Sequence, residues 1–101
     1  MKVVFSDQAL TDLIEIAIYI AQDNPARAMS FVDELEQKCL AIGNFPTGFP
    51  VVSGFESAGY RRRVAGNFVI FYRIAEHMIF IVRIMRGARD YAAILFDSED
   101  F

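Results

Sequence analysis

Three apolar runs occupy the C-terminal half of the chain, at 60–65, 68–74 and 78–85, and each is rich in β-branched and aromatic residues. Two short pairs separate them, Gly66-Asn67 and Glu76-His77, each of the length found in a β-hairpin turn. The pattern predicts an antiparallel meander. A two-residue turn at 76–77 predicts a uniform register, with the pairs Ile74 and Ile79, Tyr72 and Ile81, and Ile70 and Arg83.

Both faces of this predicted sheet are largely apolar, because Ile, Val and Phe occupy most positions on either side. A sheet with one solvated face would alternate apolar and polar residues. We therefore expect the sheet to be covered twice. The chain has helices for only one face, so something other than those helices should cover the second.

The N-terminal half predicts a short strand and two helices. Residues 2–5 suit a strand at the sheet edge, and Ser6 suits the N-cap of a helix over about 7–22. Asn24 and Pro25 indicate a restart, with a second helix over about 25–42. The two helices should form an αα-hairpin.

More than half of the first helix surface is apolar. Its predicted core stripe consists of Leu10, Leu13, Ile14, Ala17, Ile18 and Ala21. Ile16, Tyr19 and Ile20 widen the stripe, while Asp12, Glu15 and Asp23 take the remaining polar arc. We expect contacts on two sides of this helix, with Ile16, Tyr19 and Ile20 available to a partner.

The remaining segments are predicted to be irregular. Within residues 43–59, the segment 45–50 contains two prolines and two phenylalanines, Phe45 and Phe49, that should pin a loop to the core. Residues after the last strand should form a short helix or a tail. The predicted class is α+β, with residues 1–101 as a single domain.

The composition of the chain argues against several classes of protein. The chain of 101 residues is 54% hydrophobic, yet no run approaches the roughly 20 apolar residues of a membrane-spanning helix. Met1 to Phe5 lead directly into Ser6-Asp7 without the apolar region of a signal peptide, so we expect a cytoplasmic protein. One cysteine, Cys39, and one histidine, His77, predict no disulfide, no metal site and no cofactor.

Basic charge is concentrated in the meander. Seven of the ten Lys and Arg residues lie between 60 and 91, and all seven are arginines: Arg61, Arg62, Arg63, Arg73, Arg83, Arg86 and Arg89. Arginine favours planar, multidentate recognition of carboxylate or phosphate. The net charge of −3 for the whole chain argues against direct binding of nucleic acid.

Several short motifs follow one another in an order typical of one group of small bacterial proteins. They are Ser6-x-x-Ala9-x-x-Asp12-Leu13, Asn24-Pro25-x-x-Ala28, Pro46-x-Gly48, Tyr60-Arg61-Arg62, Phe71-Tyr72-Arg73 and Arg83-Ile84-x-Arg86-Gly87-Ala88-Arg89-Asp90. Through them nearly the whole chain resembles the RelE/ParE superfamily of type II toxin–antitoxin toxins. The closing Arg86-Gly87-Ala88-Arg89-Asp90 resembles the ParE-like subgroup.

The resemblance implies a toxin that poisons DNA gyrase without a catalytic site of its own. It also implies a cognate antitoxin, of ribbon-helix-helix type, whose disordered C-terminal segment folds across the toxin and offers acidic side chains to arginines. The candidate partner-binding residues are Arg61, Arg63, Arg73, Arg83, Arg86, Arg89, Ile16, Tyr19 and Ile20.

Two alternatives stay open. RelE-like members cut messenger RNA on the ribosome, and Arg61, Arg63, Arg83 and Tyr91 would then do the phosphate and proton work. The other family arginines fall at or near Val69 and Ala88 here, so this catalytic set is incomplete. The second alternative is a non-toxic, plasmid-stabilising relic whose arginines only pair with antitoxin carboxylates.

Overall fold

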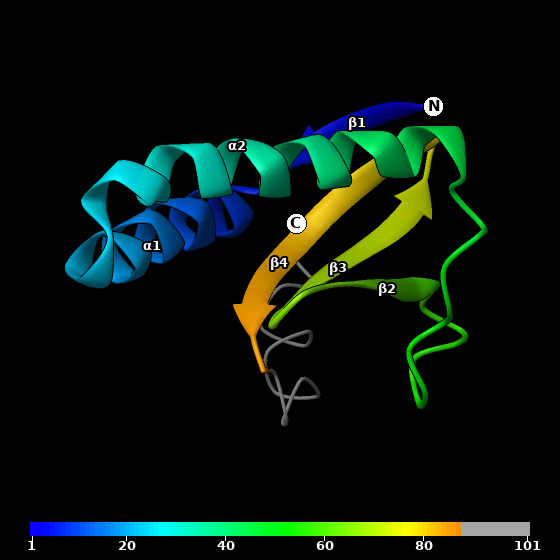
Figure 1. The fold of residues 1–101 in the computed structure, drawn as a ribbon. Coiled ribbons are helices and arrows are strands. Elements are labelled where there is room, and N and C mark those ends of the chain that lie inside the picture. The colour runs from blue at the N-terminus through cyan, green and yellow to red at the C-terminus, as the bar shows by residue number, and fades with distance from the viewer. Residues whose placement is uncertain (88–101) are drawn as a thin grey trace.

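A computed structural model describes residues 1–87 of the chain. An αα-hairpin lies across one face of a four-stranded sheet (Figure 1). The elements are β1 Lys2–Phe5, α1 Asp7–Asp23, α2 Pro25–Ala41, a 3-10 turn Ile42–Asn44, β2 Tyr60–Ala65, β3 Phe68–Ala75 and β4 Met78–Arg86. The α+β class, the hairpin and the meander are confirmed. The predicted C-terminal helix or tail lies outside the described residues.

The sheet has the strand order β1-β4-β3-β2. β1 is an edge strand, as predicted, and it runs parallel to β4, whereas β2, β3 and β4 form the antiparallel meander. Ser6 fixes the joint between β1 and α1: its Oγ accepts a hydrogen bond from the Ala9 amide at 2.9 Å and donates one to the Val82 carbonyl at 2.8 Å. One side chain thus caps α1 and ties it to β4.

The predicted register holds for the half of β3–β4 next to the turn and fails beyond it. Ile74 pairs with Ile79 and Tyr72 with Ile81, but Arg83 pairs with Phe71, not with Ile70. Val82 is an extra residue in β4, and the resulting β-bulge shifts every later pair by one position. As a result Ile84 pairs with Ile70 and belongs to the helix-side core.

Both hairpin turns have the predicted length of two residues, but only one of them contains a glycine. Gly66, with φ 62°, suits the turn between β2 and β3, because glycine adopts a positive φ without strain. Glu76 and His77, with φ 54° and 62°, place two ordinary side chains in the left-handed region between β3 and β4. This second turn therefore carries a conformational cost.

The orientation of α1 differs from the prediction. Ala9, Asp12, Leu13 and Ile16 are its buried residues, and Ile20 packs partly against the core. The predicted core residues Leu10, Ile14 and Ile18 are instead 46, 61 and 58% exposed. The prediction failed because it placed Asp12 on the polar side. With Asp12 inward, positions 9, 12, 13, 16 and 20 form a complete helical face.

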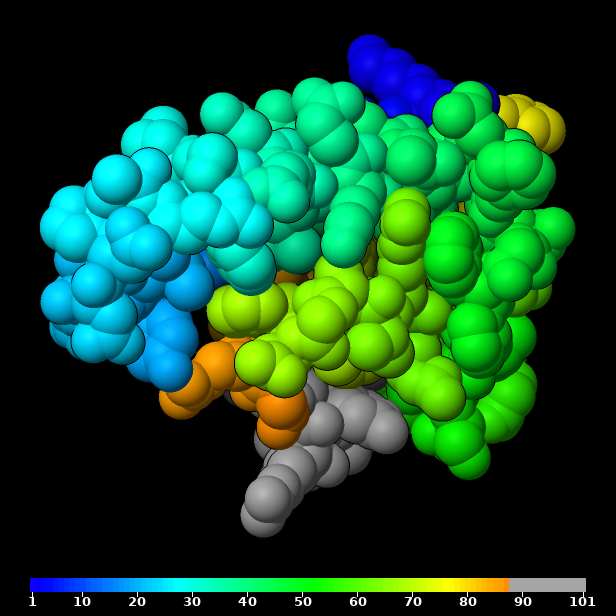
Figure 2. Space-filling model, in the orientation of Figure 1, coloured from blue at the N-terminus to red at the C-terminus, as the bar shows by residue number. Residues whose placement is uncertain are grey.

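The second face of the sheet is covered at least in part by the chain itself, which corrects the expectation of a foreign cover. Val52, Tyr60, Phe71 and Val82 are buried there, with Phe55 and Ala58 packed against them. The segment after α2 reaches this position along the β2 edge. The backbone amide of Val52 donates to the Tyr60 carbonyl at 2.8 Å, and the backbone amide of Arg62 donates to the Pro50 carbonyl at 3.0 Å. Figure 2 shows this green segment packed beside β2.

Candidate functional site

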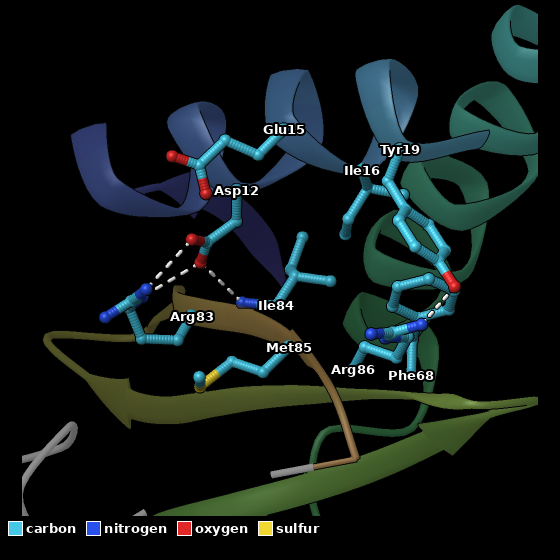
Figure 3. A pocket seen from close by; sticks show the side chains of 9 residues that line it. All are labelled: Asp12, Glu15, Ile16, Tyr19, Phe68, Arg83, Ile84, Met85 and Arg86. Carbon is cyan, nitrogen blue, oxygen red and sulfur yellow. Dashed lines mark hydrogen bonds and ion pairs between the residues drawn. The ribbon is translucent and has the colours of Figure 1, made fainter. Parts of the chain in front are cut away.

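A cleft of about 220 Å³ opens between α1 and β4 (Figure 3). Its lining residues are Asp12, Glu15, Ile16, Tyr19, Phe68, Arg83, Ile84, Met85 and Arg86. Four of the predicted partner-binding residues therefore come together here: Ile16 and Tyr19 from α1, and Arg83 and Arg86 from β4. We call this the α1–β4 cleft.

Asp12 and Arg83 form one wall of the α1–β4 cleft. Arg83 donates through Nε to Asp12 Oδ2 at 2.8 Å and through Nη2 to Oδ1 at 2.9 Å, while the Ile84 amide donates to Oδ2 at 2.9 Å. Asp12 is only 5% exposed, so these donors replace the water that its carboxylate loses. Asp12 is not among the predicted site residues; its signal in the sequence is that position 12 completes the buried spacing of α1.

Tyr19 and Arg86 lie at the mouth of the cleft. The Arg86 guanidinium sits over the Tyr19 ring, with its carbon 4.2 Å from the ring centre, and donates to the Tyr19 hydroxyl. Tyr19 is 43% exposed and Arg86 is exposed as well. Beside them Ile16 is only 7% exposed and packs in the core, so it contributes to the cleft wall rather than to an open surface.

Arg61 and Arg63 lie elsewhere, on β2, where they bind the end of α2 and the loop that follows it. Arg61 Nη1 donates to the carbonyls of Phe49 at 2.7 Å and Thr47 at 3.3 Å, and Arg63 Nη1 donates to that of Lys38 at 2.7 Å. The Arg63 guanidinium also covers the Phe49 ring at 4.9 Å. These contacts make both arginines part of the scaffold. Phe49 pins the loop as predicted, whereas Phe45 is 70% exposed.

Tyr72 lies beside this β2 cluster. Its hydroxyl donates to the Pro46 carbonyl at 2.7 Å, which adds another tie between loop and sheet. Burial raises the pKa of the Tyr72 phenol, and the nearby charges of Arg61 and Arg63 partly oppose that rise. The phenol therefore serves as a hydrogen-bond donor.

Comparison with known proteins decides the family. The model of the ParE toxin of type II toxin-antitoxin systems, parDE, matches residues 3–91. This chain belongs to the ParE toxin family. At that level it is the toxin of a type II toxin–antitoxin system, as the sequence analysis predicted.

Two solved structures resemble this ParE-family chain. One is the chromosomal ParDE TA system from P. aeruginosa, with 21% identity, a TM-score of 0.73, and coverage of 87% of this chain and 97% of the other. The second is the RelB-RelE antitoxin-toxin complex from Methanococcus jannaschii, with 14% identity, a TM-score of 0.51, and coverage of 93% and 95%. At these identities the likeness shows the fold. A search of curated proteins gave no match.

The other predicted site residues of the ParE-family chain are dispersed. Arg73 is half-buried on β3, with its guanidinium 6.0 Å from the Tyr60 ring centre, and Ile20 packs partly against the core. Arg89 and Tyr91 lie outside the described residues. The candidates for RNA cleavage are also apart, because β3 separates Arg61 and Arg63 on β2 from Arg83 on β4.

Residues 1–87 contain no group of three or more His, Cys, Asp or Glu side chains that could hold a metal ion. In the same range none of the helices has the length and apolar character needed to cross a bilayer. Cys39 is fully buried, and desolvation raises the pKa of its thiol to about 12. The thiol is therefore neutral and packs as a small apolar group.

Proposed function

We propose that this chain blocks DNA gyrase as a ParE-like toxin, without a catalytic site of its own, and that a cognate antitoxin neutralises it. Membership in the ParE toxin family supports the proposal. The proposal includes residues 1–101 acting as one domain in the cytoplasm, where the proposed target meets DNA, and no direct binding of nucleic acid by the toxin.

The observation that favours gyrase over RNA cleavage is the structural use of the candidate catalytic arginines. Cleavage through a ribose 2′-hydroxyl needs several basic groups that converge on one phosphate. Here Arg61 and Arg63 bind loop and helix carbonyls, and Arg83 binds Asp12 through two hydrogen bonds. These three guanidinium groups lie on two different strands and already hold hydrogen bonds within the protein. They are therefore poorly placed to converge on one phosphate.

The α1–β4 cleft supplies the features expected of an antitoxin-binding site. Arg86 and Tyr19 offer an exposed cation and a hydroxyl at its mouth, and Phe68 and Met85 add apolar surface. We propose that an acidic amphipathic segment of the antitoxin, which is of ribbon-helix-helix type, places a carboxylate on Arg86. Arg73 and Arg89 remain candidates for further acidic side chains of the same segment.

A supercoiling assay with purified gyrase tests the target. The toxin is expected to inhibit supercoiling and to accumulate cleaved DNA in proportion to its concentration, because it must favour the cleaved state over the resealed one. Translating ribosomes serve as the parallel assay. Full supercoiling activity at saturating toxin, or codon-specific messenger cleavage that Arg63→Ala abolishes, would contradict the proposal.

Arg86→Glu tests the antitoxin site. It is expected to weaken binding of the antitoxin encoded beside the toxin by about tenfold or more, because a charge pair becomes a repulsion. Arg62→Glu, a half-buried arginine on β2, is the matched control. Equal losses in the two variants would show that net charge, not the α1–β4 cleft, determines the affinity.

A further inference from the structure

α1 presents a row of aliphatic side chains that neither the core nor the α1–β4 cleft uses. Leu10, Ile14 and Ile18 are 46, 61 and 58% exposed. They follow one another at intervals of four residues, so they form a single row along the helix. We call these three residues the α1 row. At 3.6 residues per turn Ile14 lies about 140° round the helix from Tyr19, so the row and the cleft face different directions.

The charges along α1 are all negative. The helix contains Asp7, Asp12, Glu15 and Asp23 and no Lys or Arg. Asp12 is buried against Arg83, which leaves three exposed carboxylates. Asp7 precedes Leu10 by three positions and Glu15 precedes Ile18 by three, so both lie within a helical turn of the α1 row. The row therefore has an acidic border.

The acidic border restricts the kinds of molecule that can bind the α1 row. A nucleic acid or an anionic membrane would bring phosphates against carboxylates, and both are disfavoured. A second copy docked row to row would oppose the same acidic borders across the interface, which is a like-charge contact. A protein segment with an apolar face flanked by Lys and Arg matches both the shape and the sign.

We propose that the α1 row is a docking surface for a basic amphipathic helix of a protein partner. It is a second interface, separate from the arginine-bearing cleft that would attract an acidic segment. The inference rests on the proposed function in one respect: it assigns the row to the toxin's target and leaves the cleft to the antitoxin. The helix-on-helix geometry requires apolar anchors at spacings of three and four residues on the partner.

The first test uses two synthetic helical peptides with the same leucine pattern, one flanked by lysines and one by glutamates. The wild-type toxin is expected to bind the lysine peptide at least about tenfold more tightly, with affinity that falls as salt rises. The double variant Ile14→Ser/Ile18→Ser should lower that affinity about tenfold. Val64→Ser is the matched control, because Val64 is 64% exposed on β2.

Several outcomes would overturn the docking surface. Equal affinity for both peptides would show that charge does not select the partner. An equal loss of peptide affinity in Val64→Ser would show that the peptide does not bind at the α1 row. A toxin that dimerises with rising concentration, and loses the dimer in Ile14→Ser/Ile18→Ser, would assign the α1 row to a second copy. Thermal unfolding of each variant shows whether the serines, placed at exposed positions, leave the fold intact.

The second test separates this inference from the proposed function. The double variant is expected to inhibit gyrase at least about tenfold less strongly than the wild type while it binds antitoxin unchanged. If wild type inhibits and the variant inhibits equally, the assignment of the row to the target is wrong. If wild type does not inhibit gyrase at all, the proposed function fails, and the peptide experiment alone decides whether the row is a docking surface.

Discussion

Arg83 and Asp12, from β4 and α1, form a two-point ion pair with donor–acceptor distances of 2.8 and 2.9 Å. The Ile84 amide adds a third donor to the same carboxylate at 2.9 Å. One acidic side chain thus joins the first helix to the last described strand. It also determines which face of α1 is buried, and from that follow both the cleft and the exposed α1 row.

Asp12→Ala should be among the most destabilising single changes in the described part of the chain. It leaves the buried Ile84 amide without this acceptor and deprives Arg83 of its carboxylate. We expect the free energy of unfolding to fall by about 2–4 kcal/mol. Urea denaturation measures it, with Glu15→Ala, an exposed acid three positions on, as the control that should change stability by less than about 0.5 kcal/mol. A similar loss in both variants would mean that helix charge is responsible.

Two isoleucines on α1 test the orientation of that helix directly. Ile16 is 7% exposed and Ile14 is 61% exposed. Ile16→Ala should cost about 2–4 kcal/mol through the lost apolar contacts and the remaining cavity. Ile14→Ala should cost less than about 1 kcal/mol. Thermal unfolding of the two single variants gives the comparison, and a reversed order would show that the helix buries the face first predicted from its apolar pattern.

The turn at Glu76-His77 offers a stabilising change. Both residues have positive φ, and Asn-Gly is the pair that such a two-residue turn prefers. Glu76→Asn/His77→Gly is expected to raise the free energy of unfolding by about 1 kcal/mol. Gly66→Ala should act in the opposite direction, because Gly66 has φ 62° and open space around its Cα, so that only the backbone is strained. Lower stability in the Asn-Gly variant would contradict the turn geometry.

The buried thiol of Cys39 should make the stability of the fold depend on pH in the alkaline range. Its pKa is about 12 in the folded chain and 9.0 when unperturbed. Well below pH 9 the thiol is neutral in both states, and between about 9 and 12 it ionises mainly in the unfolded chain. Stability should therefore fall as the pH rises through this window. The raised pKa of Tyr72 acts in the same direction.

Urea titrations at several pH values measure this dependence, and Cys39→Ala should flatten the decline while Tyr72 retains its share. An alkylating reagent provides an independent readout, because the buried neutral thiol should react only after unfolding. Rapid labelling of the native protein at pH 8 would contradict the burial of Cys39.

The elements could be predicted because each has a strong local signal: period-two runs between two-residue turns, a Ser6 cap, and the Asn24-Pro25 restart. The register of β4 beyond Ile81 could not, because one extra residue in a strand leaves no mark in an apolar run. The buried face of α1 was misjudged for a different reason. A buried aspartate is indistinguishable from a surface one until its partner, distant in the chain, is known.

The candidate site, like the fold, could be predicted from the sequence only in part. The arginine concentration pointed to the right strands, and Tyr19, Arg83 and Arg86 do meet in one cleft. Their roles differ, however, since Arg61 binds a backbone carbonyl of the loop after α2 and Arg63 binds a backbone carbonyl of α2 itself. Such acceptors occur at every residue, so no sequence pattern reveals which arginine uses them.

The bulge at Val82 has a consequence for tolerance of length changes. Removing Val82 would restore an even ladder in which Arg83 still pairs with Phe71 and Ile84 with Ile70. Val82 is nevertheless tied into both sides of the sheet, because its side chain is buried on the second face and its carbonyl accepts the hydrogen bond from Ser6 Oγ. We therefore expect Val82→Ala to be absorbed far more readily than the loss of the whole residue, which would disturb the second face and the joint between β1 and α1 together.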